Sequence, residues 1–152
     1  MSDSDKFEFK DSTELPSDQV VEQIIDCMSQ FMRSSSLDRW KEKFFDRKNP
    51  FIQWVELNGK VVAFKAGYEL RPGIFYSWLG GVKPECRKKG IGQRLMQKQH
   101  DYAKQIGCQI VQTISSNHYR DMMVLNLKNG FDIVETKKKG DEVRVVMSKN
   151  LT

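Results

Sequence analysis

Apolar positions recur along the chain with two different spacings, and each spacing predicts one kind of element. Helical spacing, in which apolar residues return every three or four positions, begins after Pro16 and again after the serines at 34–36. It returns after Gly90 and once more near residue 119. The predicted helices therefore cover 17–33, 37 to just before Asn49-Pro50, 91–106 and 119–128.

Alternating or continuous apolar runs predict strands at 6–10, 51–57, 60–70, 74–82, 108–115, 131–136 and 142–148. Turn residues separate neighbouring runs at Asn58-Gly59, Arg71-Pro72-Gly73 and Lys139-Gly140-Asp141. The predicted order is β-α-α-β-β-β-α-β-α-β-β, which is an α/β fold with a mixed central sheet and helices on both faces. We expect a single domain over residues 1–152.

Composition narrows the class of protein. A chain with 39% hydrophobic and 30% charged residues is typical of soluble globular proteins. The acidic start MSDSDKFEF differs from a signal peptide, and no apolar run reaches the length of a membrane span. The three cysteines (Cys27, Cys86 and Cys108) lack metal-type spacing, so we expect reduced thiols, no bound metal and a cytoplasmic location.

The positive charge of the chain is concentrated in one segment. Between Lys83 and Lys98 there are six cations and one anion, Glu85, so this window carries a charge of +5. The whole chain also carries +5, and the other residues therefore sum to zero. A local positive field indicates an anionic partner, which at this point is a nucleic acid, a phosphate or an acidic protein.

The stretch RKKGIGQRL (Arg87–Leu95) contains four of these cations and indicates which kind of anion they bind. The amides of Lys88 to Gln93 are expected at the start of a helix, where unpaired N–H groups and the helix dipole favour an anion. Gly90 and Gly92 permit positive φ and close approach of a bulky group. The spacing differs from both the P-loop and the dinucleotide fingerprint, which disfavours ATP, GTP and NAD. The loop predicts a site for a different pyrophosphate.

These residues resemble the main motif of the GNAT superfamily of acetyl-CoA-dependent N-acetyltransferases. That motif, (R/Q)-x-x-G-x-(G/A), follows a strand ending in V-x-P and precedes a helix. Here Val82-Lys83-Pro84 precedes Arg87-Lys88-Lys89-Gly90-Ile91-Gly92 at the matching distance. A second GNAT motif, a helix that bears an asparagine and ends in Gly-Phe, is matched by Asn117 through Gly130-Phe131. The resemblance covers the chain from about Phe7 to Met147 and implies the GNAT fold.

The resemblance implies a set of cofactor contacts. Backbone groups of Gly80, Gly81 and Val82 would pair with the pantetheine arm of acetyl-CoA like an added strand. Gly80-Gly81 would also form the bulge that splays this strand from the next one. The implied cofactor-binding residues are Gly80, Gly81, Val82, Arg87, Lys88, Lys89, Gly90, Ile91, Gly92, Gln93, Asn117 and Asn126.

The chain departs from the family pattern in the last helix. GNAT enzymes often place a tyrosine four residues before the Gly-Phe glycine, where it protonates the departing CoA thiolate. Asn126 occupies that position here, and an amide cannot supply a proton. Asn117 lies two positions before the usual cofactor-binding asparagine, whose place Tyr119 takes. We expect Asn126 to contact CoA, and Tyr119 is a candidate acid or else a packing residue.

The chemistry of amines indicates which residues are needed on the acceptor side. An alkyl amine, with a pKa near ~10, must lose a proton before it attacks a thioester, and a carboxylate acting through water can take that proton. Glu69 is the candidate base, or else an exposed carboxylate at the end of a strand. Tyr76 is available to support a water chain. His100 is predicted to face solvent, and His118 is predicted near the cleft.

The predicted function is therefore an N-acetyltransferase that moves an acetyl group from acetyl-CoA to a primary amine in a ternary complex. The expected partners are acetyl-CoA and a small-molecule or protein amine, with no nucleic acid and no membrane, in a monomer or homodimer. Two other classes stay open. One is a GNAT-fold sensor that binds acyl-CoA without turnover, and the other is a basic nucleic-acid-binding module.

Overall fold

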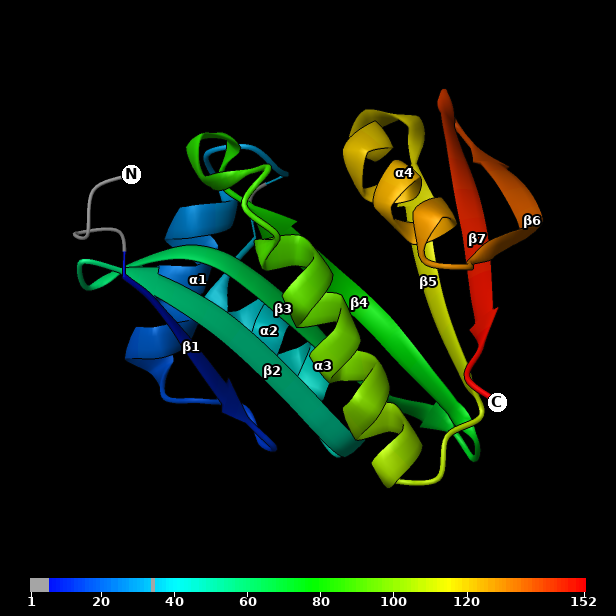
Figure 1. The fold of residues 1–152 in the computed structure, drawn as a ribbon, viewed down its shortest axis with the longest axis horizontal. Helices are drawn as coiled ribbons and strands as arrows, with labels where there is room; N and C mark the ends of the chain where they lie inside the picture. Colours follow the sequence, from blue (N-terminus) through cyan, green and yellow to red (C-terminus); the bar gives the residue numbers. More distant parts are fainter. Residues whose placement is uncertain (1–5, 34) are drawn as a thin grey trace.

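A computed structural model of the chain describes residues 6–33 and 35–152. Figure 1 shows a sheet with helices on both faces, and the sheet has seven strands in the order β1-β2-β3-β4-β5-β7-β6. Only β4 and β5 run parallel, while every other neighbouring pair is antiparallel. The predicted fold class and order of elements are confirmed.

The strands are β1 (Phe7–Ser12), β2 (Lys48–Leu57), β3 (Lys60–Arg71), β4 (Ile74–Val82), β5 (Ile110–Ser116), β6 (Asp132–Lys139) and β7 (Glu142–Asn150). The α-helices are α1 (Asp18–Met28), α2 (Leu37–Phe44), α3 (Ile91–Gln105) and α4 (Arg120–Lys128). Two short 3₁₀ helices, η1 (Pro84–Cys86) and η2 (Asn117–Tyr119), follow β4 and β5. None of the helices in the described ranges is long and apolar enough to cross a membrane.

Helix α1 is shorter than its apolar pattern predicts. The Ser17 hydroxyl caps its start by accepting from the Val20 amide, as expected for a serine at this position. The helix ends at Met28 instead of Arg33. Residues 29–33 form a loop, and the Phe31 and Met32 side chains turn onto the sheet and join its apolar core. The helical spacing of these two residues reflects their burial and does not continue the helix.

Strand β2 starts earlier than predicted, at Lys48. The chain passes through Asn49-Pro50 with Asn49 in the left-handed region, at φ 48°, and the register with β3 shifts between Lys48 and Phe51. Proline is tolerated because Pro50 has no partner in the register with either β1 or β3, so no ladder hydrogen bond needs its amide. Asn49 then donates its side-chain amide to Glu69 across the pair.

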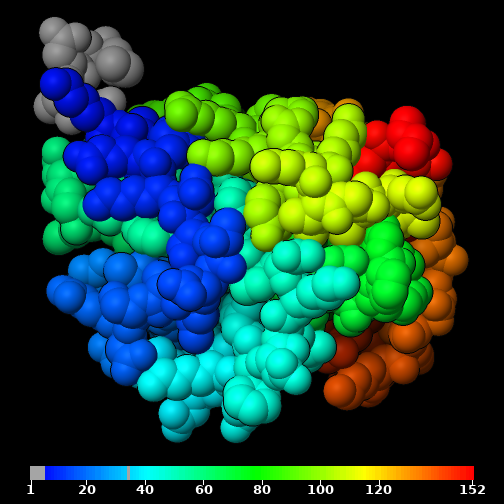
Figure 2. All heavy atoms as spheres, turned by 90° about the horizontal axis from the view of Figure 1, so that it is seen from below, coloured from blue at the N-terminus to red at the C-terminus, as the bar shows by residue number. Residues whose placement is uncertain are grey.

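The two faces of the sheet have separate apolar cores. Helices α1 and α2 cover one face over an aromatic cluster that includes Trp40, Phe64 and Trp78. Helix α3 packs on the other face against β2, β3 and β4. Figure 2 shows the two layers on opposite sides, with α1 and α2 in blue to cyan and α3 in yellow-green. These layers hold the sheet rigid around its centre.

Strands β4 and β5 part along their length, and they diverge visibly in Figure 1. They pair from Ile74–Ser77 to Ile110–Thr113 and not beyond. The bulge that bends β4 away lies at Trp78, because the register with β3 shifts between Ser77 and Leu79. The expectation of a bulge at Gly80-Gly81 is therefore wrong by two residues. The bulge places Trp78 and Leu79 on the same face, against the α1–α2 core.

Candidate functional site at the parting of two strands

Beyond Ser77, the edge of β4 that faces β5 is unpaired. The register with β3 determines which backbone groups of β4 point toward that edge. The Lys83 amide donates to Val62 O, and Gly81 lies opposite Phe64 in the same register. Antiparallel ladders alternate, so Gly81 directs its N–H and C=O to β3. Gly80 and Val82 direct theirs into the gap. Of the three residues expected to pair with pantetheine, Gly81 therefore has its backbone groups turned away.

Gly81 has a packing role on the opposite face. A Cβ at this position would stand 2.5 Å from the Phe31 ring and 3.1 Å from Met32 Sδ. The absence of a side chain thus lets the 29–33 loop lie directly on β4.

The loop before α3 has the backbone of an anion site. Lys88 and Gly90 both adopt left-handed φ, at 63° and 80°. The first helical bond joins the Arg94 amide to Gly90 O at 3.0 Å. Helices leave their first amides without a partner inside the helix, and here these are Ile91, Gly92 and Gln93. The helix dipole adds to the positive potential at this end of the gap.

The two motif glycines serve different purposes. Gly90 has open space around the position of a Cβ, so its positive φ is what calls for glycine. A Cβ on Gly92 would lie 3.3 Å from Leu125 Cδ2 of α4 and 3.8 Å from Val82 Cγ2. Gly92 therefore also lets α4 approach the start of α3.

The basic side chains of the 83–98 window make several contacts within the protein. Arg87 donates from Nε to Val82 O at 2.9 Å and pairs with Asp121 of α4 at 3.1 Å. Arg94 stacks its guanidinium on the Phe9 ring at 3.7 Å, and Lys98 pairs with Asp11 at 2.6 Å. Part of the charge thus holds β1 and α4 in place. A cavity of about 280 Å³ lies beside the loop, lined by Phe7, Phe9, Lys89, Gly90, Ile91 and Arg94.

Gln93 of α3 and Asn129, which follows the last residue of α4, form a second bridge across the gap. Their side-chain amides exchange two hydrogen bonds, at 2.6 Å and 2.8 Å. Gln93 thus has two functions, because its side chain ties the helices together while its backbone amide stays at the helix start. Together with the Arg87–Asp121 pair, it links the two sides of the gap.

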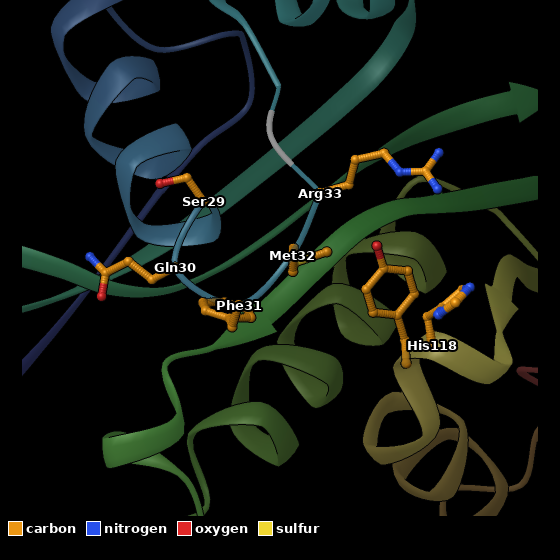
Figure 3. Close-up of a pocket in the computed structure, with 7 residues that line it drawn as sticks. Ser29, Gln30, Phe31, Met32, Arg33 and His118 are labelled. Atoms are coloured by element: carbon orange, nitrogen blue, oxygen red, sulfur yellow. The ribbon is translucent and has the colours of Figure 1, made fainter.

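A pocket of about 410 Å³ opens over the parting on the face of α1 and α2. One wall is the 29–33 loop and the other is η2, which follows β5. Figure 3 shows Phe31 and Met32 over β4 with His118 across from them. The lining residues are Ser29, Gln30, Phe31, Met32, Arg33, His118 and Tyr119. Arg33 also lies 3.9 Å from Glu142 of β7.

The structure brings some of the predicted catalytic residues to this pocket. Tyr119 lines it and is partly buried, and His118 lines it and is exposed. Asn117 is exposed at the start of η2, and it is not among the lining residues. Tyr76 lies in the aromatic core beside Tyr68, and burial raises the pKa of its phenol.

Glu69 lies at the closed end of the sheet, away from the gap. Its carboxylate accepts from Asn49 Nδ2 at 2.8 Å and from the Gly73 amide at 3.4 Å. It is 8% exposed, and β4 and β5 are still paired at this level. One oxygen thus holds the start of β2 and the other holds the β3–β4 turn, so the structure favours the structural role of Glu69 over that of a base.

Asn126 is buried in the core under α4. It is 4% exposed, and its Nδ2 points to Met147 Sδ of β7 at 3.7 Å. Its carbonyl oxygen in the backbone accepts from the Phe131 amide and so shapes the end of the helix. This packing accounts for a small side chain at the position where the family often has tyrosine.

His100 is buried, so the prediction that it faces solvent is wrong. It is 3% exposed and its ring lies 5.6 Å from that of Phe131. Burial, with the positive fields of Lys149 and Lys65, lowers the pKa of its imidazole to about 4. Its Nε2 and both side-chain polar atoms of Gln99 have no hydrogen-bond partner within the described residues.

The sequence analysis missed the 29–33 loop and the buried Lys65. The apolar spacing of Phe31 and Met32 resembled a continuing helix, so the loop gave no separate signal. Lys65 lies in the β3 run KVVAFKAGYEL, where a lone cation between apolar residues was a readable sign of an unusual buried charge.

Comparisons with known proteins agree with this geometry. The profile of the acetyltransferase (GNAT) family matches residues 18–122. A comparison with curated proteins finds no match. The solved structure of ribosomal-protein-S18-alanine N-acetyltransferase from Escherichia coli is 15% identical, with a TM-score of 0.78 over 95% of each chain. Ard1 from Thermoplasma volcanium is 13% identical, with a TM-score of 0.78 over 96% of this chain and 98% of its own.

One similar structure contains the expected cofactor. A Bacillus anthracis str. Ames protein described as a streptothricin acetyltransferase, in complex with acetyl coenzyme A, is 18% identical with a TM-score of 0.63. The alignment covers 72% of this chain and 66% of that one. At these identities the structures show a shared fold, and the family profile spans most of the chain. The chain belongs to the acetyltransferase (GNAT) family.

Proposed function

We propose that this protein transfers an acetyl group from acetyl-CoA to a primary amine, directly and within a ternary complex. The observation that carries the proposal is the unpaired edge of β4, with the backbone groups of Gly80 and Val82 turned into the gap and the amide-rich start of α3 at its end. An extended arm that carries amides at one end and a pyrophosphate at the other is complementary to this arrangement.

The cofactor would lie along the gap with its pyrophosphate at the start of α3 and its thioester near the bulge in β4. Its pyrophosphate would accept from the amides at 91–93, with Lys88 and Lys89 beside it. Its pantetheine amides would pair with the N–H and C=O of Gly80 and with the N–H of Val82, whose carbonyl already accepts from Arg87 Nε. The thioester would then reach the level of Leu79, just past the bulge, where the pocket opens on the other face.

The acceptor amine would enter from the pocket lined by the 29–33 loop and η2. Of the described lining residues none is acidic, and Arg33 contributes a cation. A polyamine would find no partner for its extra positive charges in this lining. The favoured acceptors are therefore amines without further cationic groups, such as a peptide N-terminus or a neutral amine.

His118 and Tyr119 are the groups in the pocket that can assist the amine. Histidine is the side chain best suited to take a proton near neutral pH, and we assign to His118 the proton that the amine loses. The Tyr119 hydroxyl would hydrogen-bond to the acceptor and orient it. Glu69 has no part in this scheme because its carboxylate caps the β3–β4 turn.

The test combines binding and turnover with the full chain. Acetyl-CoA at a hundred times its dissociation constant should stabilise the protein by about 2.7 kcal/mol, seen as a higher melting temperature, while NAD and ATP do much less. A panel of amines should release CoA thiol, faster from neutral amines and peptides than from spermidine. His118→Gln and Tyr119→Phe should slow release and leave the melting shift intact.

Matched variants and a DNA titration separate the alternatives. Lys88→Asn keeps a residue that tolerates left-handed φ but removes the charge, and it should weaken acetyl-CoA binding. Lys104→Asn, near the other end of α3, should not. A melting shift without CoA release by any amine would favour the sensor. Binding to duplex DNA with a steep salt dependence, unaffected by CoA, would favour the nucleic-acid module.

A further inference from the structure

Lys65 is a buried cation to which no described residue offers an anionic partner. It is 6% exposed on β3, and within residues 6–33 and 35–152 no carboxylate pairs with its ammonium group. Burial lowers the pKa of this amine to about 8. A charge in such a place is costly to folding, and such groups are frequent at functional sites.

The side chain of Lys65 lies across Gly80 at the edge of the gap. If Gly80 had a Cβ, Lys65 Cγ would be 3.3 Å and Nζ 3.6 Å from it. The two strands are paired so that Gly80 lies directly opposite Lys65. The aliphatic part of the Lys65 side chain thus passes over Gly80, where β4 has no side chain to block it. Its ammonium group lies over Gly80, a residue whose own backbone N–H and C=O face the gap.

The groups around Lys65 leave its charge uncompensated. Across from it on β2 is Gln53, whose side chain donates to Leu95 O at 3.0 Å. From α3 the titratable neighbour is His100, whose imidazole is held neutral by burial at pH 7. Gly80, opposite Lys65 on β4, carries no charge. An anion that forms transiently in the gap would therefore meet a cation that no described residue neutralises.

We propose that Lys65 stabilises the sulfur of CoA as it leaves the acetyl group and donates a proton to it. The inference rests on the proposed function, which places the thioester at the level of Leu79, next to Gly80, when pantetheine pairs with Gly80 and Val82. It gives the acid that Asn126 cannot provide, because an amide has no proton to transfer and this one is turned to Met147. Tyr119 lies at the acceptor pocket on the opposite face.

The step balances without any further reactant. The neutral amine attacks the thioester carbonyl, and the carbonyl electrons move to oxygen. When the tetrahedral intermediate collapses, the C=O bond forms again and the C–S bond breaks with its electron pair on sulfur. The proton on Lys65 Nζ moves to this sulfur and gives CoA thiol. The proton lost from the amine nitrogen reaches solvent through His118, and solvent protonates Lys65 again.

The first measurement is the ionisation of the CoA thiol bound to the protein. Thiolate absorbance is followed against pH, and the same titration with desulfo-CoA subtracts the protein's own cysteines. A cation beside the sulfur should make the thiol ionise at least tenfold more readily in the wild type than in Lys65→Met. Lys65→Arg keeps the charge and should keep this effect. Lys60→Met, at the exposed start of the same strand, is the matched control.

The second measurement is turnover in the same four proteins. Loss of a general acid costs about a hundredfold or more, so Lys65→Met should lower kcat by that factor with a small change in KM for acetyl-CoA. Lys65→Arg should also turn over slowly, because a guanidinium does not release its proton. In the wild type kcat should fall above pH about 8, as Lys65 loses its proton, and this limb should be absent in Lys65→Met.

The outcomes separate this inference from the proposed function. Identical thiol titrations in the wild type and Lys65→Met, or a kcat for Lys65→Met within twofold of that of Lys60→Met, would overturn the role of Lys65 and leave acetyl transfer standing. Failure of the wild type to bind acetyl-CoA would overturn both. The variant should fold, since methionine has a similar length and removes a buried charge, and its melting temperature records this.

Discussion

His100 illustrates how a buried position can be hidden among charged neighbours. It follows Lys98 and Gln99 and precedes Asp101, a local composition typical of a solvated surface. In the helix, however, it lies one turn after Met96 and three residues before Ala103, and all three are buried on the inner face of α3. The position of His100 on the inner face of the helix therefore decides its burial, and the polarity of its sequence neighbours does not.

The burial of His100 makes stability depend on pH. Its pKa falls from 6.5 in the unfolded chain to about 4 in the folded protein, so the unfolded chain binds the extra proton between these values. The stabilisation is present above pH 6.5 and is lost as pH falls toward 4. At 1.36 kcal/mol per pKa unit the loss is at most about 3 kcal/mol. Urea unfolding at pH 7, 5.5 and 4 should show it.

A pair of substitutions isolates the effect of His100. His100→Gln removes the titrating group and should flatten the decline in the free energy of unfolding between pH 6.5 and 4. His118→Gln, at an exposed position, should leave that decline unchanged. An equal decline in wild type and His100→Gln would mean that other groups cause it.

Residue roles could be predicted from the sequence only where the backbone alone decides them. Gly90 is an example, because its motif position and its positive φ agree. Glu69 and Asn126 are the opposite case. Their positions along the strand and the helix are as expected, but their partners, Asn49 and Met147, lie 20 and 21 residues away in sequence. No local pattern could have shown which way those side chains turn.

At the scale of elements, the loop that leads into α3 was well predicted and the loop that leaves α1 was not. The α3 loop has glycines and a V-x-P that announce a turn and a helix start, and α3 begins at Ile91 as predicted. The loop at 29–33 has apolar residues at helical spacing and no glycine or proline. Tertiary packing of Phe31 on β4 decides its conformation, and single-sequence reasoning has no access to that contact.

The two glycines of the α3 loop should respond differently to alanine. Gly90→Ala places a side chain at φ 80° in open space, which costs about 1–2 kcal/mol through backbone strain alone. Gly92→Ala places a methyl group 3.3 Å from Leu125. A double-mutant cycle with Leu125→Ala should therefore show a coupling of at least about 0.5 kcal/mol for Gly92→Ala and additive effects, within about 0.3 kcal/mol, for Gly90→Ala.

Urea unfolding of the two single glycine variants, Leu125→Ala and the two doubles provides these energies. Coupling of both glycines to Leu125 would mean that α4 rests on the whole loop. Coupling of neither would contradict the close approach of Leu125 to Gly92.

At the scale of the whole molecule, the order of elements was predictable because apolar spacing and turn residues are local signals. The strand order and the parting of β4 and β5 depend on pairings between distant segments; the family resemblance implied the parting, and the strand order comes from the structure. The precise site of the bulge, at Trp78, follows from the fit of Trp78 and Leu79 into the aromatic core under α1 and α2. The family resemblance, applied to the sequence, placed the bulge instead at the neighbouring glycines, Gly80 and Gly81.

The parting of β4 and β5 also has a consequence for how the molecule loosens. The two strands are joined over four residue pairs, and a shared apolar cluster that includes Phe75, Val111 and Met147 lies at that end. At the other end the halves are joined by side-chain bridges such as Arg87–Asp121. Opening there breaks these bridges and the contact of Leu125 with the start of α3, but it leaves the core under α1 and α2 intact, so it should require less free energy than global unfolding.

Native-state hydrogen exchange in the absence of ligand should therefore divide the chain into units that open separately. Amides of α4 and of the first residues of β7 should exchange through a low-energy opening, and Val111 only through global unfolding. Equal opening energies at all these sites would show a single cooperative unit. A molecule that bridges the gap would make the two sides open together. The factor by which acetyl-CoA slows hydrogen exchange in α4 would therefore measure how tightly the bound cofactor couples the two sides.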